Sequence, residues 1–431
     1  MADLVLRAQR VLLDGELRPA AVTVTNGVIT GVGVVDAAAV APVEIDLPDH
    51  TVLLPGFVDT HVHVNEPGTD WEGFRTATAA AAAAGITTIV DMPLDCRPVT
   101  TTVAALRTKQ AVAEGNCRVE VGFWAGVVPE NLDELGSLAA AGVRGFKCFL
   151  ADSGNPDFGY LTPAQFRVAM SRIAELGSVL LVHAESHRVI AGSAPPHGRR
   201  YASFLRSRPD AAEEDAVRLV VDTAAATGAR AHIVHVSSAN VLAMLADAKR
   251  AGIPVTAETC PHYLTFTAEA IPDGGTEFAA CPPVREAANR DRLWDGLLDG
   301  TLDMVVSDHS PCSPKLKADG DFGQAFGGVS SLQVGPGAVW AHAAQHGFGL
   351  PDLSRWMAQR PAALAGYADR GRIAPGLRAD LCAFDPAAES PVHTEDLLHR
   401  HRISPYDGVT VRGAVLQTWV AGVPVLEKVA A

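Results

Sequence analysis

Eight short apolar segments run through the middle of the chain, and they constrain its fold more than any other feature. Helical segments, predicted over residues 75–84, 163–176, 211–227 and 239–251 among others, separate most of them. This alternation is typical of parallel strands joined by helices, and eight such units predict an α/β fold, a (β/α)8 TIM barrel. The apolar segments begin near Phe57, Ile86, Val119, Gly145, Val179, Ala231, Val255 and Met304.

Both ends of the chain have a different pattern. Residues 22–25 alternate in polarity and lead into Asn26-Gly27, a pair that suits the tight turn of a β-hairpin. Residues 417–426 show a similar pattern and also predict a β-hairpin. With 431 residues, the chain is long enough for a barrel and an added domain. We therefore predict a small β-sandwich domain built from residues 1–54 and 375–431, and a barrel over residues 55–374.

Charge and cysteine content restrict the partners and the compartment. With 35 basic and 49 acidic residues, the formal charge of −14 argues against nucleic acid or an anionic membrane as partner. No apolar run has the length of a membrane span, and residues 1–3 do not resemble a secretory signal. The seven cysteines are odd in number and contain no CxxC pair, which argues against a disulfide framework. We expect a cytoplasmic protein that binds a small molecule.

The first predicted strand carries an HxH motif. His61 and His63 are two residues apart, so on a strand their side chains share a face and can reach one metal ion. Alone, this motif is weak evidence, because histidines also occur in ordinary polar clusters.

Further candidate ligands lie at or near the ends of other predicted strands. Lys147 lies within the fourth predicted strand, and His183, His235 and Asp308 end the fifth, sixth and eighth. Barrel enzymes place their chemistry at this face, whereas unrelated structural residues would have no reason to gather there. Taken singly, His183 could be a hydrogen-bonded core residue and Asp308 a helix cap. His232 and His235 are three apart, so we expect only His235 to face the barrel interior and His232 to point to the outer layer.

Lys147 is the most informative of these residues. A lysine inside an apolar strand is costly unless its charge is handled, and an ammonium would also repel metal ions. Carboxylation would convert it to a carbamate that can bridge two cations. The carbamate, Asp308 and a hydroxide would then remove three of the four positive charges of two divalent ions, and four neutral histidines would complete the shells. The alternative is a lysine whose head group reaches solvent at the barrel rim.

Taken together, these residues resemble the amidohydrolase superfamily, and in particular its cyclic amidase branch of dihydroorotases, hydantoinases or dihydropyrimidinases, and allantoinases. The resemblance covers essentially the whole chain, including residues 371–381 at the return to the β domain. Several segments are similar to those of allantoinases, namely residues 65–68, 71–73, 145–149, 258–263, 281–285, 307–312 and 404–406.

Departures from the relatives bear on the substrate. Dihydroorotases carry an arginine two residues after the HxH motif, where it grips the substrate carboxylate, and this chain has Asn65. Hydantoinases carry a tyrosine at the position of Asp152 and usually a serine at that of Cys281. Because allantoin has no carboxylate, the resemblance implies hydrolysis of allantoin to allantoate. The alternatives are a hydantoinase or dihydropyrimidinase and, less favoured, a non-catalytic structural relative.

The resemblance also implies roles for the individual residues. His61, His63 and Asp308 would bind one ion, His183 and His235 a second, and carboxylated Lys147 would bridge them. A hydroxide between the ions would be the nucleophile, with Asp308 as general base and then general acid. Zinc is expected, with manganese, cobalt, iron or nickel as alternatives. Substrate contacts are expected at Asn65, Cys281 and Gly328, a lid at residues 310–328, and a homo-oligomer, commonly a tetramer.

Overall fold

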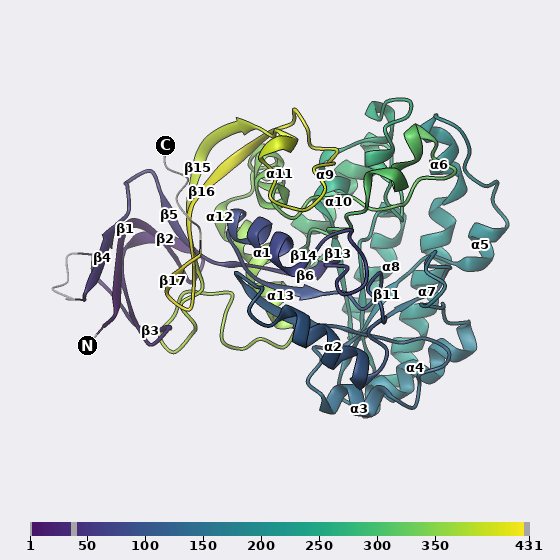
Figure 1. Cartoon of the computed structure of the whole chain (residues 1–431), viewed down its shortest axis with the longest axis horizontal. Helices are drawn as coiled ribbons and strands as arrows, with labels where there is room; N and C mark the ends of the chain where they lie inside the picture. The colour runs from purple at the N-terminus through teal and green to yellow at the C-terminus, as the bar shows by residue number, and fades with distance from the viewer. Residues whose placement is uncertain (1, 36–40, 426–431) are drawn as a thin grey trace.

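The computed structural model describes residues 2–35 and 41–425, and the larger part of it is a barrel of parallel strands surrounded by helices (Figure 1). Neighbouring strands pair in parallel from β6 to β8 and from β9 to β14. β8 and β9 are separated only by Trp124, and a parallel bridge from Val62 to His309 joins the last strand position to the first. The predicted TIM barrel is therefore confirmed. The barrel strands are β6 (Phe57–Val62), β7 (Ile86–Asp91), β8 (Glu120–Phe123), β9 (Ala125–Gly126), β10 (Phe146–Phe149), β11 (Val179–His183), β12 (Arg230–Ile233), β13 (Val255–Thr259) and β14 (Met304–Val305).

Helices cover the outside of the barrel, and α4 shows why the sequence places them there. Thr162 accepts a hydrogen bond from the Gln165 amide, and Gln165 bonds back to Thr162, a capping box that starts the helix. The buried residues Phe166, Ala169, Met170 and Ile173 recur at helical spacing and give α4 one apolar face. The described helices are α1 (Phe74–Ala83), α2 (Val103–Ala113), α3 (Leu135–Ala140), α4 (Pro163–Glu175), α5 (His187–Ala191), α6 (Tyr201–Ser207), α7 (Asp210–Thr227), α8 (Leu242–Arg250), α9 (Pro261–Thr265), α10 (Ala287–Leu298), α11 (Gly335–Ala343), α12 (Leu350–Ser354) and α13 (Arg360–Leu364).

The two ends of the chain form one β-sheet beside the barrel (Figure 1). Its order is β17-β16-β15-β5-β1-β2-β3, and β4 pairs with β1. This sheet has its own apolar core, to which β1, β2, β15 and β16 all contribute. The expected β-sandwich built from both termini is thus present, although residues 1, 36–40 and 426–431 of the predicted domain lie outside the described residues. Its strands are β1 (Leu4–Leu13), β2 (Glu16–Thr25), β3 (Val28–Gly33), β4 (Val43–Asp46), β5 (Val52–Pro55), β15 (Leu381–Pro391), β16 (Thr410–Val420) and β17 (Val423–Pro424).

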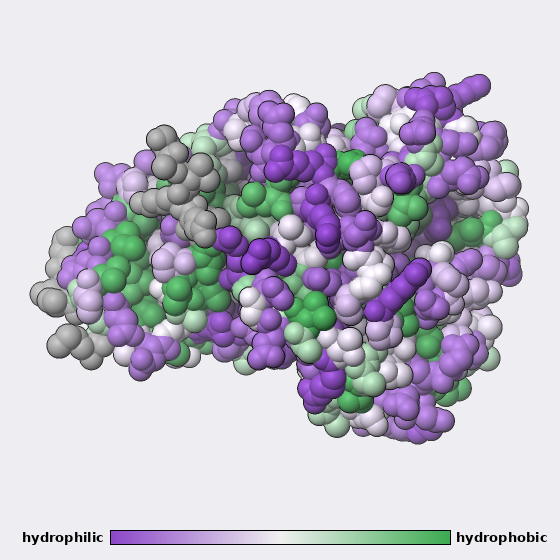
Figure 2. Space-filling model, viewed as in Figure 1, coloured by the Kyte–Doolittle hydropathy of each residue, from purple (hydrophilic) through white to green (hydrophobic). Residues whose placement is uncertain are grey.

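The terminal sheet also carries much of the exposed apolar surface. Figure 2 shows apolar side chains grouped over this sheet, whereas polar side chains dominate the same face of the barrel. All seven cysteines are free thiols. Among residues 2–35 and 41–425, no helix has both the length and the apolar character that a membrane span requires. In the described parts of residues 1–54 and 375–431, the exposed large apolar residues are Leu17, Val28, Val34, Val43, Leu398, Leu416 and Val423.

Candidate metal centre

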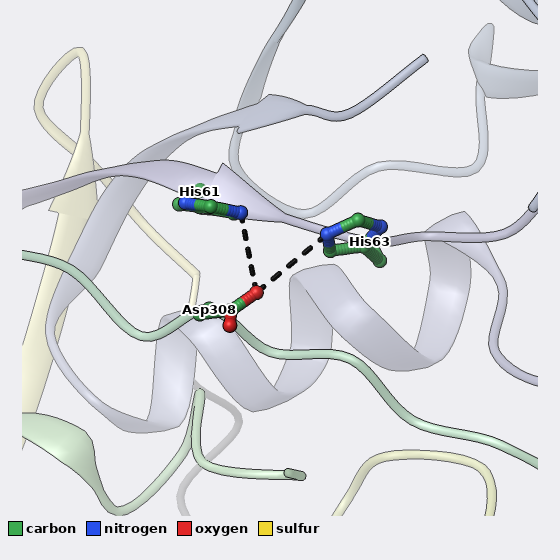
Figure 3. A group of neighbouring side chains, drawn as sticks. All are labelled: His61, His63 and Asp308. Carbon is green, nitrogen blue, oxygen red and sulfur yellow. Dashed lines mark ion pairs between the residues drawn. The ribbon is translucent and has the colours of Figure 1, made fainter. Parts of the chain in front are cut away.

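His61 and His63 form the first half of the candidate site together with Asp308. β6 places both histidines on one side, with ring centroids 5.5 Å apart. The Asp308 Oδ1 atom lies 3.2 Å from Nε2 of His61 and 3.6 Å from Nε2 of His63. Figure 3 shows the three side chains converging from β6 and from the segment after β14. All three residues are buried, and their donor atoms are close enough together to hold one metal ion.

His183 and His235 form the second half. Their rings meet edge to face with centroids 4.6 Å apart, and His235 is 5.4 Å from the ring of His61. His183 is the last residue of β11, whereas His235 lies two residues beyond the end of β12. The two pairs of histidines therefore lie next to each other at or just beyond the carboxyl ends of their strands.

Positive backbone φ angles direct two of these side chains into the site. His235 has φ 40° and Asp308 has φ 43°. Non-glycine residues rarely adopt this left-handed conformation, and it interrupts the strand alternation that their neighbours follow. His235 lies two residues beyond the end of β12 and Asp308 three residues beyond the end of β14, so a change of direction there does not disturb the barrel ladder.

Lys147 lies in the middle of this group without a counterion. It is only 1% exposed, and its Nζ atom is 4.8 Å from the ring centroid of Phe149. Within the described chain it has no ion pair. Burial lowers the pKa of Lys147 from 10.5 to about 8, although Asp308 and Glu258 act in the opposite direction. The alternative of a head group in solvent at the rim does not fit this burial.

Burial also favours the neutral form of three of these histidines, His63, His183 and His235. It lowers the pKa of His183 to about 4, and it holds the pKa values of His63 and His235 well below the ordinary value. Neutral imidazoles have the lone pairs that a cation needs. In addition, the Nδ1 atoms of His63 and His235 are buried without a hydrogen-bond partner. These observations fit a site whose donors are satisfied by metal ions.

Two buried glutamates orient the histidines, and the sequence analysis missed both. Glu258 contacts Nδ1 of His61 at 2.5 Å, which directs Nε2 of that ring towards Asp308. Glu185 contacts Nε2 of His183 at 2.7 Å, which leaves the Nδ1 atom of this ring available to bind a metal ion. Carboxylates that fix ring orientation in this way are a regular feature of metal-bound histidines. Glu185 lies two residues after His183 and Glu258 near the end of the seventh strand, so strand-end position was an available signal.

The prediction for His232 is wrong. Instead of facing the outer layer, its Nε2 contacts Glu258 at 2.8 Å, on the opposite carboxylate oxygen from His61. Its Nδ1 contacts the Thr256 hydroxyl at 2.7 Å. The argument from spacing failed because β12 ends at Ile233 and the left-handed conformation of His235 breaks the alternation. His232 and His235 therefore both face the inside of the barrel.

A cavity of about 870 Å³ opens above this group. It is lined by all six predicted ligands, His61, His63, Lys147, His183, His235 and Asp308, and by Cys281 and Gly328. Among the described residues, Asn65 is not part of the lining, because its Nδ2 donates to the Pro311 carbonyl at 3.1 Å. The amide of Gly328 donates to Ala279, and its carbonyl accepts from Lys317 at 2.7 Å.

The segment predicted as a lid forms part of the cavity wall. Lys317 donates to the carbonyls of Phe326 and Gly328, and Phe326 packs edge to face against Trp71 at 4.9 Å. Phe322 is buried against Tyr201. These contacts tie residues 310–328 to the barrel, and movement of this segment remains a prediction.

A second cluster of donors adjoins the first. Cys260, His262 and Asp308 lie close enough to hold a metal ion, and both ring nitrogens of His262 are buried without a partner. Because this cluster shares Asp308 with the first, we treat it as an extension of the same centre.

Comparison with known proteins identifies the family. The sequence profile described as "Amidohydrolase family" matches residues 52–425, almost the entire chain.

The chain belongs to the amidohydrolase family.

Relatives of similar length show which members of the amidohydrolase family this chain is similar to in sequence. It is 48% identical to the allantoinase of Streptomyces avermitilis over 421 residues, which cover 97% of this chain and 94% of the relative. It is 39% identical to the allantoinase of Saccharomyces cerevisiae over 435 residues, with the same coverage of 97% and 94%.

Solved structures of cyclic amidases are also similar to this chain. The L-hydantoinase (dihydropyrimidinase) of Arthrobacter aurescens superposes with a TM-score of 0.93 at 29% identity, over 99% of this chain and 97% of that one. The dihydropyrimidinase of Brevibacillus agri superposes with a TM-score of 0.89 at 28% identity, over 99% and 95%. The fold of this amidohydrolase is therefore that of the cyclic amidases.

Proposed function

We propose that this chain hydrolyses the cyclic amide bond of allantoin to give allantoate. The observation that carries the proposal is the gathering of four histidines, Asp308 and buried Lys147 on the wall of one cavity. The substrate follows from the allantoinases to which the chain is similar over nearly its whole length. Allantoin is an uncharged ring with a ureido substituent, and a cavity of this size accommodates it.

In this proposal, His61, His63 and Asp308 hold one divalent ion, and His183 and His235 hold a second. Lys147, as N6-carboxylysine, would supply one carbamate oxygen to each. The unpartnered Nδ1 atom of His235 and the lack of a counterion at Lys147 support this assignment. Zinc is the metal that we expect, and manganese, cobalt, iron and nickel suit the same donors.

In this mechanism the bound ions activate the reactants, and side chains of the protein transfer the proton. When bound, the ions would polarise the scissile carbonyl and activate the attacking hydroxide. Asp308 would accept the proton of this nucleophile and deliver it to the ring nitrogen that leaves. The Ser310 hydroxyl donates to Oδ1 of Asp308 at 2.9 Å and orients the carboxylate for both steps. Burial raises the pKa of Asp308, with His61 opposing the effect, which favours its service as a proton acceptor.

Substrate positioning is proposed to involve backbone groups of Cys281 and Gly328. Both residues line the cavity, and the Gly328 carbonyl retains a second lone pair beside its bond to Lys317. A substrate role for Asn65 would be indirect, through the Pro311 backbone that it contacts.

The similarity of the fold to the Arthrobacter aurescens L-hydantoinase favours one alternative, a hydantoinase or dihydropyrimidinase. Turnover of allantoin, hydantoin, dihydrouracil and dihydroorotate by the metal-replete enzyme distinguishes these activities. We expect kcat/KM for allantoin to exceed that for dihydroorotate at least roughly tenfold, the scale of one pocket contact. Equal turnover of dihydroorotate would refute the allantoinase assignment while leaving the metal centre intact.

We further propose a cytoplasmic homo-oligomer, with a tetramer as the expected state. The free cysteines support a reducing compartment, and the exposed apolar residues of the terminal sheet offer a surface for association. The domain boundaries, residues 1–54 with 375–431 and residues 55–374, belong to the same proposal. Sedimentation of the purified protein tests the oligomeric state.

A further inference from the structure

Arg208 is a cationic side chain on the cavity wall that the proposed reaction does not use. It directly follows α6 and lines the same cavity as the candidate ligands. Its backbone position is well fixed. The Arg208 carbonyl accepts from Nη2 of Arg285 at 3.2 Å, and Glu213 in turn holds that guanidinium at 2.8 Å. A side chain that begins from so rigid a point keeps its head group in a defined region of the cavity.

The head group of Arg208 is anchored by one of its five N–H donors. Nη1 donates to Oε2 of Glu185, the same oxygen that contacts Nε2 of His183. Glu185 is fully buried, so the pair contributes no net charge to the site. Within the described residues, the remaining guanidinium N–H groups have no acceptor in the protein. The nitrogens of these N–H groups are accessible, because none of them is a fully buried atom that lacks a hydrogen-bond partner.

A purely structural role would need only the contact with Glu185. The unused donors lie in a plane, and a guanidinium presents them as a fork that matches a flat carbonyl group. Polar groups that fix the orientation of a ligand are few in a typical binding cavity, and each of them tends to be matched by the ligand. The acceptor for Arg208 is therefore to be sought on the substrate.

We propose that Arg208 determines specificity by donating to the ureido carbonyl that allantoin carries at C5. This inference rests on the proposed function, because hydantoin and allantoin share the ring that is opened and differ in that substituent. The ureido group is uncharged and planar, and its carbonyl is a strong acceptor. Such a contact would let the site distinguish allantoin from hydantoins with an apolar or absent substituent.

The test compares two substrates in one variant. Arg208→Lys keeps a positive charge beside Glu185 but replaces the fork with a single point donor. Arg206→Lys is the matched control, because Arg206 lies two residues earlier, is exposed and is not part of the cavity lining. Allantoin is assayed as substrate, and hydantoin both as substrate and as competitive inhibitor, so that its affinity is measured even when its turnover is slow. Metal content is measured in every sample.

We expect Arg208→Lys to lower the preference for allantoin over hydantoin by roughly tenfold to a hundredfold, the range of one hydrogen bond to a charged group. Metal content should equal that of the wild type, and Arg206→Lys should leave the preference unchanged. An equal loss for both substrates with the metal retained would overturn the proposal, because Arg208 would then contact the shared ring. Equal losses together with metal loss would also overturn it, since Arg208 would act only through Glu185 and His183. If the wild-type enzyme opens hydantoin but not allantoin, the proposed function itself fails.

Discussion

Carboxylation of Lys147 should depend on pH in a way that the burial of this residue defines. Only the neutral amine can attack carbon dioxide, and burial lowers the pKa of Lys147 from 10.5 to about 8. At pH 7, about one in ten of the Lys147 side chains is then neutral, against about one in 3,000 for a solvated lysine, a gain of roughly 300-fold. The protonated form dominates below a pH of about 8, so carboxylation should become faster as the pH rises and level off above that value.

Reconstitution of metal-depleted enzyme measures this dependence. The protein is incubated at a fixed concentration of dissolved carbon dioxide and of zinc, between about pH 6 and about pH 12, a range that spans both the lowered and the ordinary lysine pKa. Recovered activity is followed over time, and ¹³C-labelled carbon dioxide reports the carbamate carbon by NMR. We expect the initial rates of both signals to rise together, with a midpoint near 8.

Variants of Lys147 separate the carbamate from the amine. Lys147→Ala should lose the carbamate signal, metal and activity together while the barrel stays folded, and short carboxylic acids should restore part of the activity. Lys147→Arg should be inactive, because a guanidinium remains cationic and cannot be carboxylated. A midpoint near the ordinary lysine pKa would refute the argument from burial. An unmodified Lys147 amine in a crystal of active, fully metallated enzyme would refute the bridging role altogether.

Three other perturbations test the roles of single groups. Asp308→Asn should lower kcat by roughly a hundredfold to ten-thousandfold, the usual effect of losing a general acid–base, and a kcat that stays near the wild-type value would exclude Asp308 from proton transfer. Glu258→Gln should weaken metal binding roughly tenfold to a hundredfold in an equilibrium titration, because an amide cannot accept from both His61 and His232. Thiol titration of the denatured protein without reductant should find all seven cysteines free, and stoichiometric disulfides would contradict the cytoplasmic proposal.

Much of the fold was predictable because barrel strands are local features. A buried parallel strand appears as a short apolar run, and the predicted starts at Phe57, Ile86, Val179, Val255 and Met304 coincide with those of the structure. The pairing of the two termini was also predictable, since hairpins at both ends need a shared core. What the sequence did not reveal is the strand order of that sheet, in which β5 joins β1 to β15, because such pairing depends on contacts far apart in the chain.

The gathering of the candidate ligands was predictable for a related reason. The two-residue repeat of a strand places His61 and His63 together, and parallel strands bring their carboxyl ends to one face. These rules use position along a strand only, so they also locate Lys147 and His183. They lose validity beyond the strand end, where His235 and Asp308 adopt the left-handed conformation. The sequence misplaced His232 because the alternation of β12 was assumed to continue as far as His235.

Sequence by itself therefore determined the barrel and the six candidate ligands that line one cavity at its face. Tertiary structure alone decided how those side chains are aimed and what supports them. The left-handed conformation of His235, the position of Glu258 between two histidines and the approach of Arg208 to Glu185 all depend on elements that are distant in the chain. Local periodicity records which face a residue occupies, whereas hydrogen bonds across the barrel form only once packing has brought their partners within reach.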